Sequence, residues 1–460
     1  MKISNSVAIG LIGLLLLMAY GHTLNFPFQF DDYNVIVDEP KVHGLSAWWQ
    51  YTWQSMPGLR PILKLTYALN WQLEAAPRFF RLFNLICHLF TTILVWRFSL
   101  RLLPYLKVDE HHHRSIALLT ALLFGLHPAQ TEVVTYISSR STGLMTLFSI
   151  ISLLFFLACL QTQTKLKISY FLASVAFWIL AMLVKEPAMI LPLLAWLLFR
   201  LVHPQVGMVD CISALSSLKK LLLILMLSVP IVYISTTPQY ARLVMRIFSL
   251  DNLYAQLLSQ SVAHLHYLTH TLFGLNLNID YQLDVPNTFN MNTGLFVLLL
   301  LVIIGAALFY VKRFPLICFV ILWWFICLIP SNSIIPRLDL INDRQIYMAS
   351  LGALLLIATG IILVASKLEK VKLFWLLPIA LLSYSLIATH LRNWDYESEI
   401  SLWQASIRQA PDNSRAWNNL GYAYLLAHQN VQAKLAFEKA LQLDESNYKA
   451  FYNLQQLKDK

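Results

Sequence analysis

Charged residues are scarce in this chain. Asp, Glu, Lys and Arg make up 13% of its 460 residues, whereas 58% are hydrophobic, and the mean hydropathy is +0.59. A soluble chain carries about twice that share of charge. The composition therefore excludes an ordinary soluble protein. It predicts a membrane protein whose spans are helical, because a helix satisfies its own backbone groups inside lipid.

Two sequence patterns are also absent. The five cysteines show no metal-binding or redox spacing, so we expect buried thiols. No Asn-x-Ser/Thr glycosylation site occurs anywhere in the chain, although proteins that face a eukaryotic secretory lumen often carry one. This second absence favours a bacterial inner membrane over a eukaryotic compartment.

Long apolar runs predict about eleven spans, since ~20 apolar residues cross a bilayer core. The predicted spans cover 6–24, 80–100, 115–131, 143–160, 168–184, 186–203, 220–237, 293–311, 315–331, 346–366 and 371–389. Residues 255–275 are also apolar but contain three histidines, His264, His266 and His270. We expect this segment to be a helix lying on the outer face rather than a span.

Basic residues gather in alternate short connectors, such as Arg97–Arg114 and Lys312–Arg313, which predicts that these connectors face the cytoplasm. The formal net charge of +10 is explained by this bias, and no nucleic-acid partner is expected. The long connectors 25–79 and 238–292 then face outward. This topology puts the N-terminus in the cytoplasm and the C-terminal tail in the periplasm. It divides the chain into a membrane domain, 1–390, and a helical tail, 391–460.

The tail carries the pattern of a tetratricopeptide repeat. Residues 411–444 fit one 34-residue helix-turn-helix unit. Its packing positions are occupied by Ala416, Trp417, Leu420, Gly421, Tyr424, Ala433, Phe437 and Ala440. Residues 398–410 can supply the second helix of a preceding unit. Because at least three repeats are usually needed for independent stability, we expect the tail to pack on the membrane domain, either as a docking platform or as a structural cap.

Polar residues concentrate on the predicted outer face. Asp31 and Asp32 follow the first span, and they form either a solvated loop or a general base whose pKa is raised by its like-charged neighbour. Arginine and lysine can bind phosphate oxygens there, and the candidates are Arg60, Arg140, Lys185 and Arg344. Further outer-face or span-end polar residues are Asn84, His88, His127, Glu132 and Tyr347. Asp31, Asp32 and Glu132 could also hold a divalent cation through their oxygens, the one cofactor considered.

At these residues the sequence resembles the GT-C glycosyltransferases, and within them the TMTC-type branch with C-terminal tetratricopeptide repeats and its bacterial relatives. The matching segments are FQFDDYNVI at 28–36, LRP at 59–61, FRLFNLICH at 80–88, FGLHPAQTEVVTYISSRS at 124–141, VKEPAM at 184–189, LNIDY at 277–281, IPSNSIIP at 329–336, DRQIYMAS at 343–350 and RNWDYESEISLW at 392–403. Their order along nearly the whole chain carries the resemblance.

The resemblance implies a GT-C fold and an inverting transferase with a polyprenyl-phosphate sugar donor, working at the non-cytoplasmic face. It makes Asp31 the expected base with Asp32 beside it, places His127 and Glu132 in the pocket, and favours Arg344 for the donor phosphate. The acceptor is expected to be a protein hydroxyl, such as a pilin Ser or Thr, or alternatively a glycolipid. The repeat array is shorter than in eukaryotic members, and KEP at 185–187 replaces the usual KEQ. A lipid-linked sugar transporter and a non-catalytic scaffold are the competing hypotheses.

Overall fold

A computed structural model describes residues 4–54, 60–206, 250–282, 291–332, 341–368 and 376–458. Within these ranges the chain is helical and contains no strand, which confirms the predicted all-α class. The membrane-domain helices are α1 (Asn5–Tyr20), α2 (Leu45–Gln54), α3 (Pro61–Leu73), α4 (Pro77–Leu102), α5 (His113–Gly125), α6 (Thr131–Thr135), α7 (Arg140–Gln161), α8 (Leu166–Val184), α9 (Leu191–Val202), α13 (Leu250–Phe273), α14 (Met291–Tyr310), α15 (Pro315–Leu328), α16 (Ile346–Lys367) and α17 (Leu376–Asn393). The tail contains α18 (Glu399–Gln409), α19 (Ser414–Leu426), α20 (Asn430–Leu443) and α21 (Tyr448–Lys458).

Five helices of the described residues are long and apolar enough to cross a membrane, or six if one bent pair is a single span. The count of about eleven spans is therefore not supported. The five are Asn5–Asn25, Pro77–Leu106, Ile137–Gln161, Leu166–Val184 and Asp343–Lys367. The predicted spans 293–311 and 315–331 form shorter apolar helices, Gly294–Tyr310 and Pro315–Leu328. The predicted span 220–237 lies outside the described residues.

Proline accounts for two of these differences. The predicted span 115–131 divides at Pro128 into two helical segments bent by 53°. His127, the residue before this proline, is extended at φ −72° and ψ 130°, as the proline ring requires of its predecessor. The predicted span 186–203 begins with a 3-10 turn, Glu186–Ile190, which leaves α9 only 12 residues long. Each break takes residues out of a span and makes them part of a polar turn.

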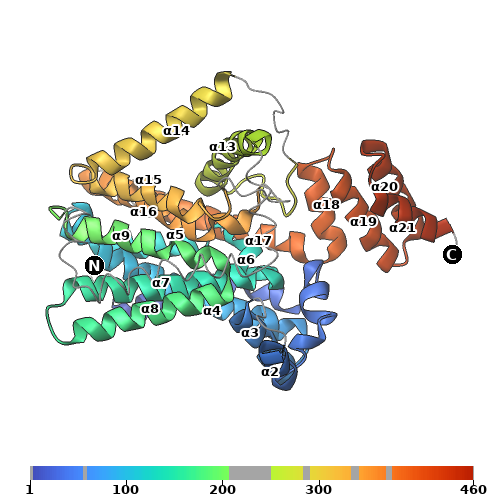
Figure 1. The fold of residues 1–460 in the computed structure, drawn as a ribbon, viewed down its shortest axis with the longest axis horizontal. Helices are drawn as coiled ribbons and strands as arrows, with labels where there is room; N and C mark the ends of the chain where they lie inside the picture. Colours follow the sequence, from blue (N-terminus) through green and yellow to red (C-terminus); the bar gives the residue numbers. More distant parts are fainter. Residues whose placement is uncertain are drawn as a thin grey trace.

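The core of the membrane domain is built by α4, α5, α7 and α16, which pack against one another (Figure 1). Large side chains such as Phe98, Phe124 and Trp323 are fully buried there. α14 projects away from this core at the top of the view. Two of the predicted inner connectors also touch, because the Lys107 Nζ donates to the Lys312 carbonyl at 2.8 Å. This contact agrees with their assignment to one membrane face.

The tail helices follow α17 directly and extend to the right of the view in Figure 1. α19 and α20 form the helix-turn-helix predicted at 411–444, and α18 supplies the preceding helix. Gly421 sits where a Cβ would lie 2.6 Å from the Phe437 ring, so only glycine allows the two helices to approach this closely. Ala416 and Leu420 bury against Phe26, Tyr136 and Ile279 of the membrane domain. The expectation that the tail packs on the membrane domain is thus confirmed.

Candidate functional site

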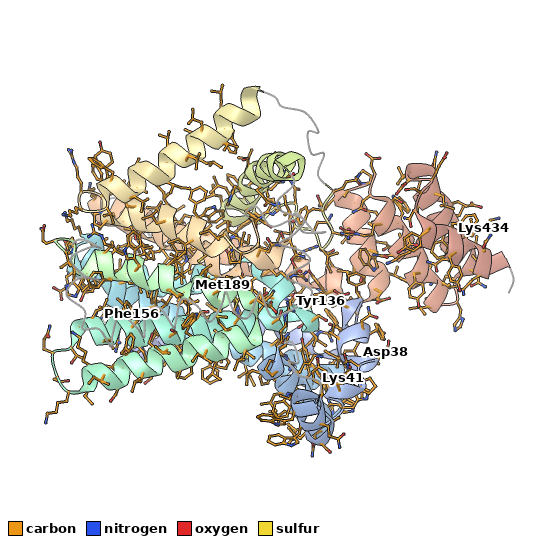
Figure 2. All side chains as sticks on the ribbon, in the orientation of Figure 1. Asp38, Lys41, Tyr136, Phe156, Met189 and Lys434 are labelled. Atoms are coloured by element: carbon orange, nitrogen blue, oxygen red, sulfur yellow. The ribbon has the colours of Figure 1, made fainter. Side chains whose placement is uncertain are left out.

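One segment, residues 127–140, contacts most of the polar groups of the candidate site, and we call it the central segment. It runs from the proline break through α6 to the start of α7. In Figure 2, Tyr136 lies where the membrane helices, the tail and the helices α2 and α3 converge. Four distant segments bond to it: the turn at Asp31 and Asp32, α4, α13 and the segment at Arg344. The bonding residues of the central segment are His127, Glu132, Thr135, Tyr136, Ser138 and Arg140. The broken helix therefore supplies the frame on which the other polar groups are arranged.

Asp32 is fully buried and held by that segment. Its Oδ1 accepts the Ser138 N–H at 2.8 Å and the Ser138 hydroxyl at 2.5 Å, and its Oδ2 accepts the Gln29 N–H at 3.1 Å. Burial raises the pKa of Asp32 to about 6, although these hydrogen bonds and the charge of Arg81 oppose the rise. The carboxyl closes the four-residue turn Gln29–Asp32, which we call the acidic turn.

Asp31 is half-buried, and its backbone N–H donates to the Tyr136 hydroxyl at 3.0 Å. Phe30, just before it, has a φ of +47°, a left-handed conformation that costs a non-glycine residue about 1–2 kcal/mol. Strain of this kind persists only where the surroundings impose it. Contacts with the central segment thus hold the acidic turn in a conformation that leaves Asp31 partly exposed and keeps Asp32 buried.

Lys185 and Arg344 line one pocket, together with Gln345, which we call the cationic pocket. Its remaining walls come from α7, α9, α15 and α16, and they include Thr142, Met145, Ser149, Pro187, Ala188, Ile190, Leu191, Cys327, Ser331 and Met348. The Lys185 Nζ donates to the Thr142 hydroxyl at 2.6 Å. The cationic pocket thus joins two of the predicted phosphate-binding residues to an apolar wall.

Glu132 orients Arg344 from the buried side. Its carboxylate accepts hydrogen bonds from the Arg344 backbone N–H at 3.0 Å and from a guanidinium N–H at 3.2 Å. The Arg344 side chain is 23% exposed, whereas that of Glu132 is 1% exposed. The pair places the charge of Arg344 at the pocket edge. Arg60 is fixed in a similar way, since its guanidinium makes two hydrogen bonds to Glu186, at 3.0 and 2.9 Å, beside Lys185.

Arg140 lies in a second, closed cluster with Asn84, His88 and Tyr347, around a small internal space. Its guanidinium donates to the Asn84 side chain, the Thr66 hydroxyl and the Phe80 carbonyl. His88 bonds to the Tyr347 hydroxyl at 2.7 Å and to the Gly125 carbonyl at 2.9 Å. These four predicted site residues are brought together, but apart from Lys185 and Arg344.

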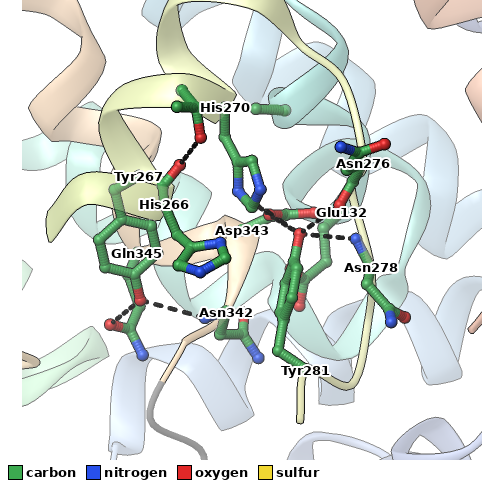
Figure 3. A network of polar contacts seen from close by, with 12 residues as sticks. Glu132, His266, Tyr267, His270, Asn276, Asn278, Tyr281, Asn342, Asp343 and Gln345 are labelled. Atoms are coloured by element: carbon green, nitrogen blue, oxygen red, sulfur yellow. Dashed lines mark hydrogen bonds and ion pairs between the residues drawn. The ribbon is translucent and has the colours of Figure 1, made fainter. Parts of the chain in front are cut away.

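A third polar network lies beneath α13 (Figure 3). Asp343 accepts the Tyr281 hydroxyl at 2.7 Å and lies 3.3 Å from the His270 Nδ1. Tyr267 accepts the Asn342 N–H and donates to Gln345 of the cationic pocket. The sequence pattern predicts no site role for these network residues. Three histidines in an apolar helix nevertheless indicate that one face of that helix meets polar groups.

His127 joins this network through the Thr271 carbonyl, 3.0 Å from its Nε2. No three His, Cys, Asp or Glu side chains within the described ranges stand close enough to hold a metal ion. Asp32 and Glu132 are turned toward Ser138 and Arg344 respectively. Within the described residues, no set of side chains is therefore arranged to bind the divalent cation considered above.

Fold and site together define a helical membrane-type protein with a polar, partly cationic site under a repeat-containing tail. A tetratricopeptide repeat model matches residues 402–434. Over 95% of its length the chain is 25% identical to the mouse protein O-mannosyl-transferase TMTC3, of which it covers 50%. It is also 25% identical, over 95% of its length, to the protein O-mannosyl-transferase F38B6.6 of Caenorhabditis elegans, of which it covers 63%.

A shorter stretch, 30% of the chain, is 30% identical to the human protein O-mannosyl-transferase TMTC1. Over most of its length the chain is thus similar to TMTC-type protein O-mannosyl-transferases, and it carries a tetratricopeptide repeat match near its C-terminal end. It spans about half the length of the TMTC3 proteins it matches. The predicted resemblance is confirmed.

Proposed function

We propose that this protein is a GT-C-type glycosyltransferase that moves a sugar from a polyprenyl-phosphate carrier to an acceptor hydroxyl on a protein, at the periplasmic face of a bacterial inner membrane. The names of the relatives make mannose the first sugar to test. One observation carries the proposal: the central segment binds the acidic turn through Tyr136 and binds Arg344 of the cationic pocket through Glu132, four residues earlier.

The cationic pocket suits a lipid phosphate. Lys185 and Arg344 can neutralise phosphate oxygens, while Met145, Leu191 and Met348 give an apolar wall for the first prenyl units. Glu132 holds Arg344 in place before any substrate arrives, and charge that is positioned beforehand costs no reorganisation during reaction. The central segment connects this pocket to Asp31 through Tyr136.

The reaction we propose is a single displacement. The Asp31 carboxylate takes the proton of the acceptor hydroxyl, and the hydroxyl oxygen bonds to the anomeric carbon. The bond between that carbon and the phosphate oxygen breaks, and its electron pair leaves with the lipid phosphate. Lys185 and Arg344 stabilise the leaving charge. One base and a direct attack invert the anomeric configuration.

The test uses the full chain in lipid nanodiscs with undecaprenyl-phosphate-[³H]mannose. Serine- and threonine-containing peptides and a glycolipid serve as alternative acceptors. We expect label to reach a peptide hydroxyl, and Asp31→Asn to abolish it while Asp38→Asn, at an exposed position of the same loop, does not. Wild-type transfer by both Asp31→Asn and Asp32→Asn would refute the mechanism. Label on the glycolipid alone would show that the acceptor is a lipid rather than a protein. Because nanodiscs do not separate two compartments, product formation in this assay cannot result from transport.

A further inference from the structure

The acidic turn is held from two sides, and one of them is the tail. On the membrane side, Tyr136 accepts the Asp31 N–H and Ser138 donates to Asp32. On the tail side, the Gln29 side chain donates to the Tyr396 carbonyl. The Phe30 ring also stacks edge-to-face on Trp403, with centroids 5.0 Å apart. The backbone around Asp31 is thus clamped between two domains.

Glu399 makes the most direct of the tail contacts. Its Oε1 accepts the Phe30 backbone N–H at 2.5 Å, across 369 positions of sequence. Phe30 is the residue in the left-handed conformation, and it is bonded through its carbonyl carbon to the nitrogen of Asp31. A carboxylate that binds this N–H therefore acts one peptide unit from the proposed base.

The fold fixes Glu399 in its place. Glu399 is the first residue of α18, and Ser398 and Ser401 form a reciprocal capping box around it. Glu399 is half-buried, and this burial raises the pKa of its carboxyl. Tyr396 and Trp403, on either side of Glu399 in sequence, are both buried in the cluster that joins tail and membrane domain.

We propose that Glu399 is a positioning residue for the transfer reaction, which makes α18 part of the active site rather than an independent module. The proposal rests on the function proposed above. Without this acceptor the Phe30 N–H loses its partner and the left-handed backbone relaxes, so Asp31 shifts away from the acceptor hydroxyl. Glu399 does not line the cationic pocket, so donor binding should be unaffected.

Two variants separate the hydrogen bond from the charge. Glu399→Ala removes the acceptor, whereas Glu399→Gln keeps a carbonyl oxygen at the same position. Glu397→Ala, at an exposed carboxylate two residues earlier, is the matched control. Each full-length protein is examined by hydrogen exchange of peptides covering 26–34, and by kcat and donor KM with undecaprenyl-phosphate-mannose and a serine peptide.

We expect Glu399→Ala to exchange the 26–34 amides about 10-fold faster and to lose about 10-fold in kcat, because small misplacements of catalytic groups are costly. Donor KM should stay within about twofold, since the cationic pocket is untouched. Glu399→Gln and Glu397→Ala should resemble the wild type in all three measurements.

Unchanged exchange or wild-type kcat in Glu399→Ala would overturn the proposal. Equal losses in Glu399→Gln and Glu399→Ala would overturn it too, because the charge rather than the hydrogen bond would then be responsible. If the wild type transfers no sugar at all, the proposed function fails. Hydrogen exchange still decides by itself whether Glu399 orders the acidic turn.

Discussion

Arg344 and Arg140 show how differently two similar residues can be used. Arg140 is 1% exposed, and its guanidinium bonds to a side-chain amide, a hydroxyl and a carbonyl of the protein itself. Arg344 is 23% exposed, lines the cationic pocket and is steadied from behind by Glu132. A fully buried charge that bonds to protein groups stabilises packing, whereas a partly exposed charge at a pocket edge can meet a ligand.

The same contrast separates the two adjacent carboxylates. The carboxylate oxygens of Asp32 accept hydrogen bonds from Ser138 and Gln29. Asp31 is half-buried, and its backbone N–H is held by the Tyr136 hydroxyl. The turn therefore converts two chemically equivalent neighbours into an internal support and a surface group. Four experiments test whether the enclosed and the accessible members of these pairs behave differently.

The largest effect is expected at Asp31. Asp31→Asn should lower transfer about 10³-fold, since general-base catalysis contributes on that scale, and should leave the melting temperature nearly unchanged. Radiolabel transfer measures the activity, and a thermal unfolding scan of the same preparation measures the melting temperature. Retained activity would remove Asp31 from the mechanism and make the accessible carboxylate no more functional than the enclosed one.

Arg140→Ala should instead destabilise the fold by about 3 kcal/mol, because it leaves buried acceptors on Asn84 and Phe80 without their donor. Arg140→Lys should recover little of this, since one ammonium cannot reach three separated acceptors. Thermal unfolding of the two variants is the measurement. A stable Arg140→Ala protein with a raised donor KM would contradict the structural role and return Arg140 to the donor site.

Arg344→Ala should reduce kcat/KM for the lipid-phosphate donor about 10²-fold, the scale of losing one charge that stabilises a transition state. Its melting temperature should also fall, because the buried Glu132 carboxylate loses its guanidinium partner and keeps only the backbone N–H of residue 344. Steady-state kinetics at varied donor concentration provide the test. Equal kinetics in wild type and Arg344→Ala would show that the cationic pocket does not bind the donor phosphate.

The smallest effect concerns the pH dependence of stability. The pKa of Asp32 rises from 3.8 to about 6 on folding, so the native state binds more protons than the unfolded state between these values. The contribution of Asp32 to stability is therefore full only below the unfolded pKa of 3.8 and is lost as pH rises through 6; the part lost between pH 4 and 7 is about 2 kcal/mol. Asp32→Asn should flatten this slope in unfolding scans from pH 4 to 7. An identical slope in the variant would assign the dependence to other groups.

The sequence predicted the helical class, the repeat in the tail and the gathering of polar groups, because each follows from local composition or spacing. Long apolar runs predicted α4, α7, α8 and α16 closely. The count of about eleven spans is not supported by the described residues, in part because length and apolarity alone cannot show where Pro128 and the turn at Glu186 divide a run. Asn84 and His88 are four positions apart, a spacing that puts two residues on one helix face, and they do line one internal space.

Only the tertiary structure decided which polar side chains meet. Glu132 and Arg344 are 212 positions apart, Asp31 and Tyr136 are 105 apart, and Phe30 and Glu399 are 369 apart. Helix spacing relates residues three or four positions apart and carries no information on such distances. The sequence by itself thus determined which polar groups lie near the ends of the apolar runs. The packing of the broken helix and the tail determined which of them are enclosed and which remain accessible, because burial and hydrogen bonding depend on neighbours from distant elements.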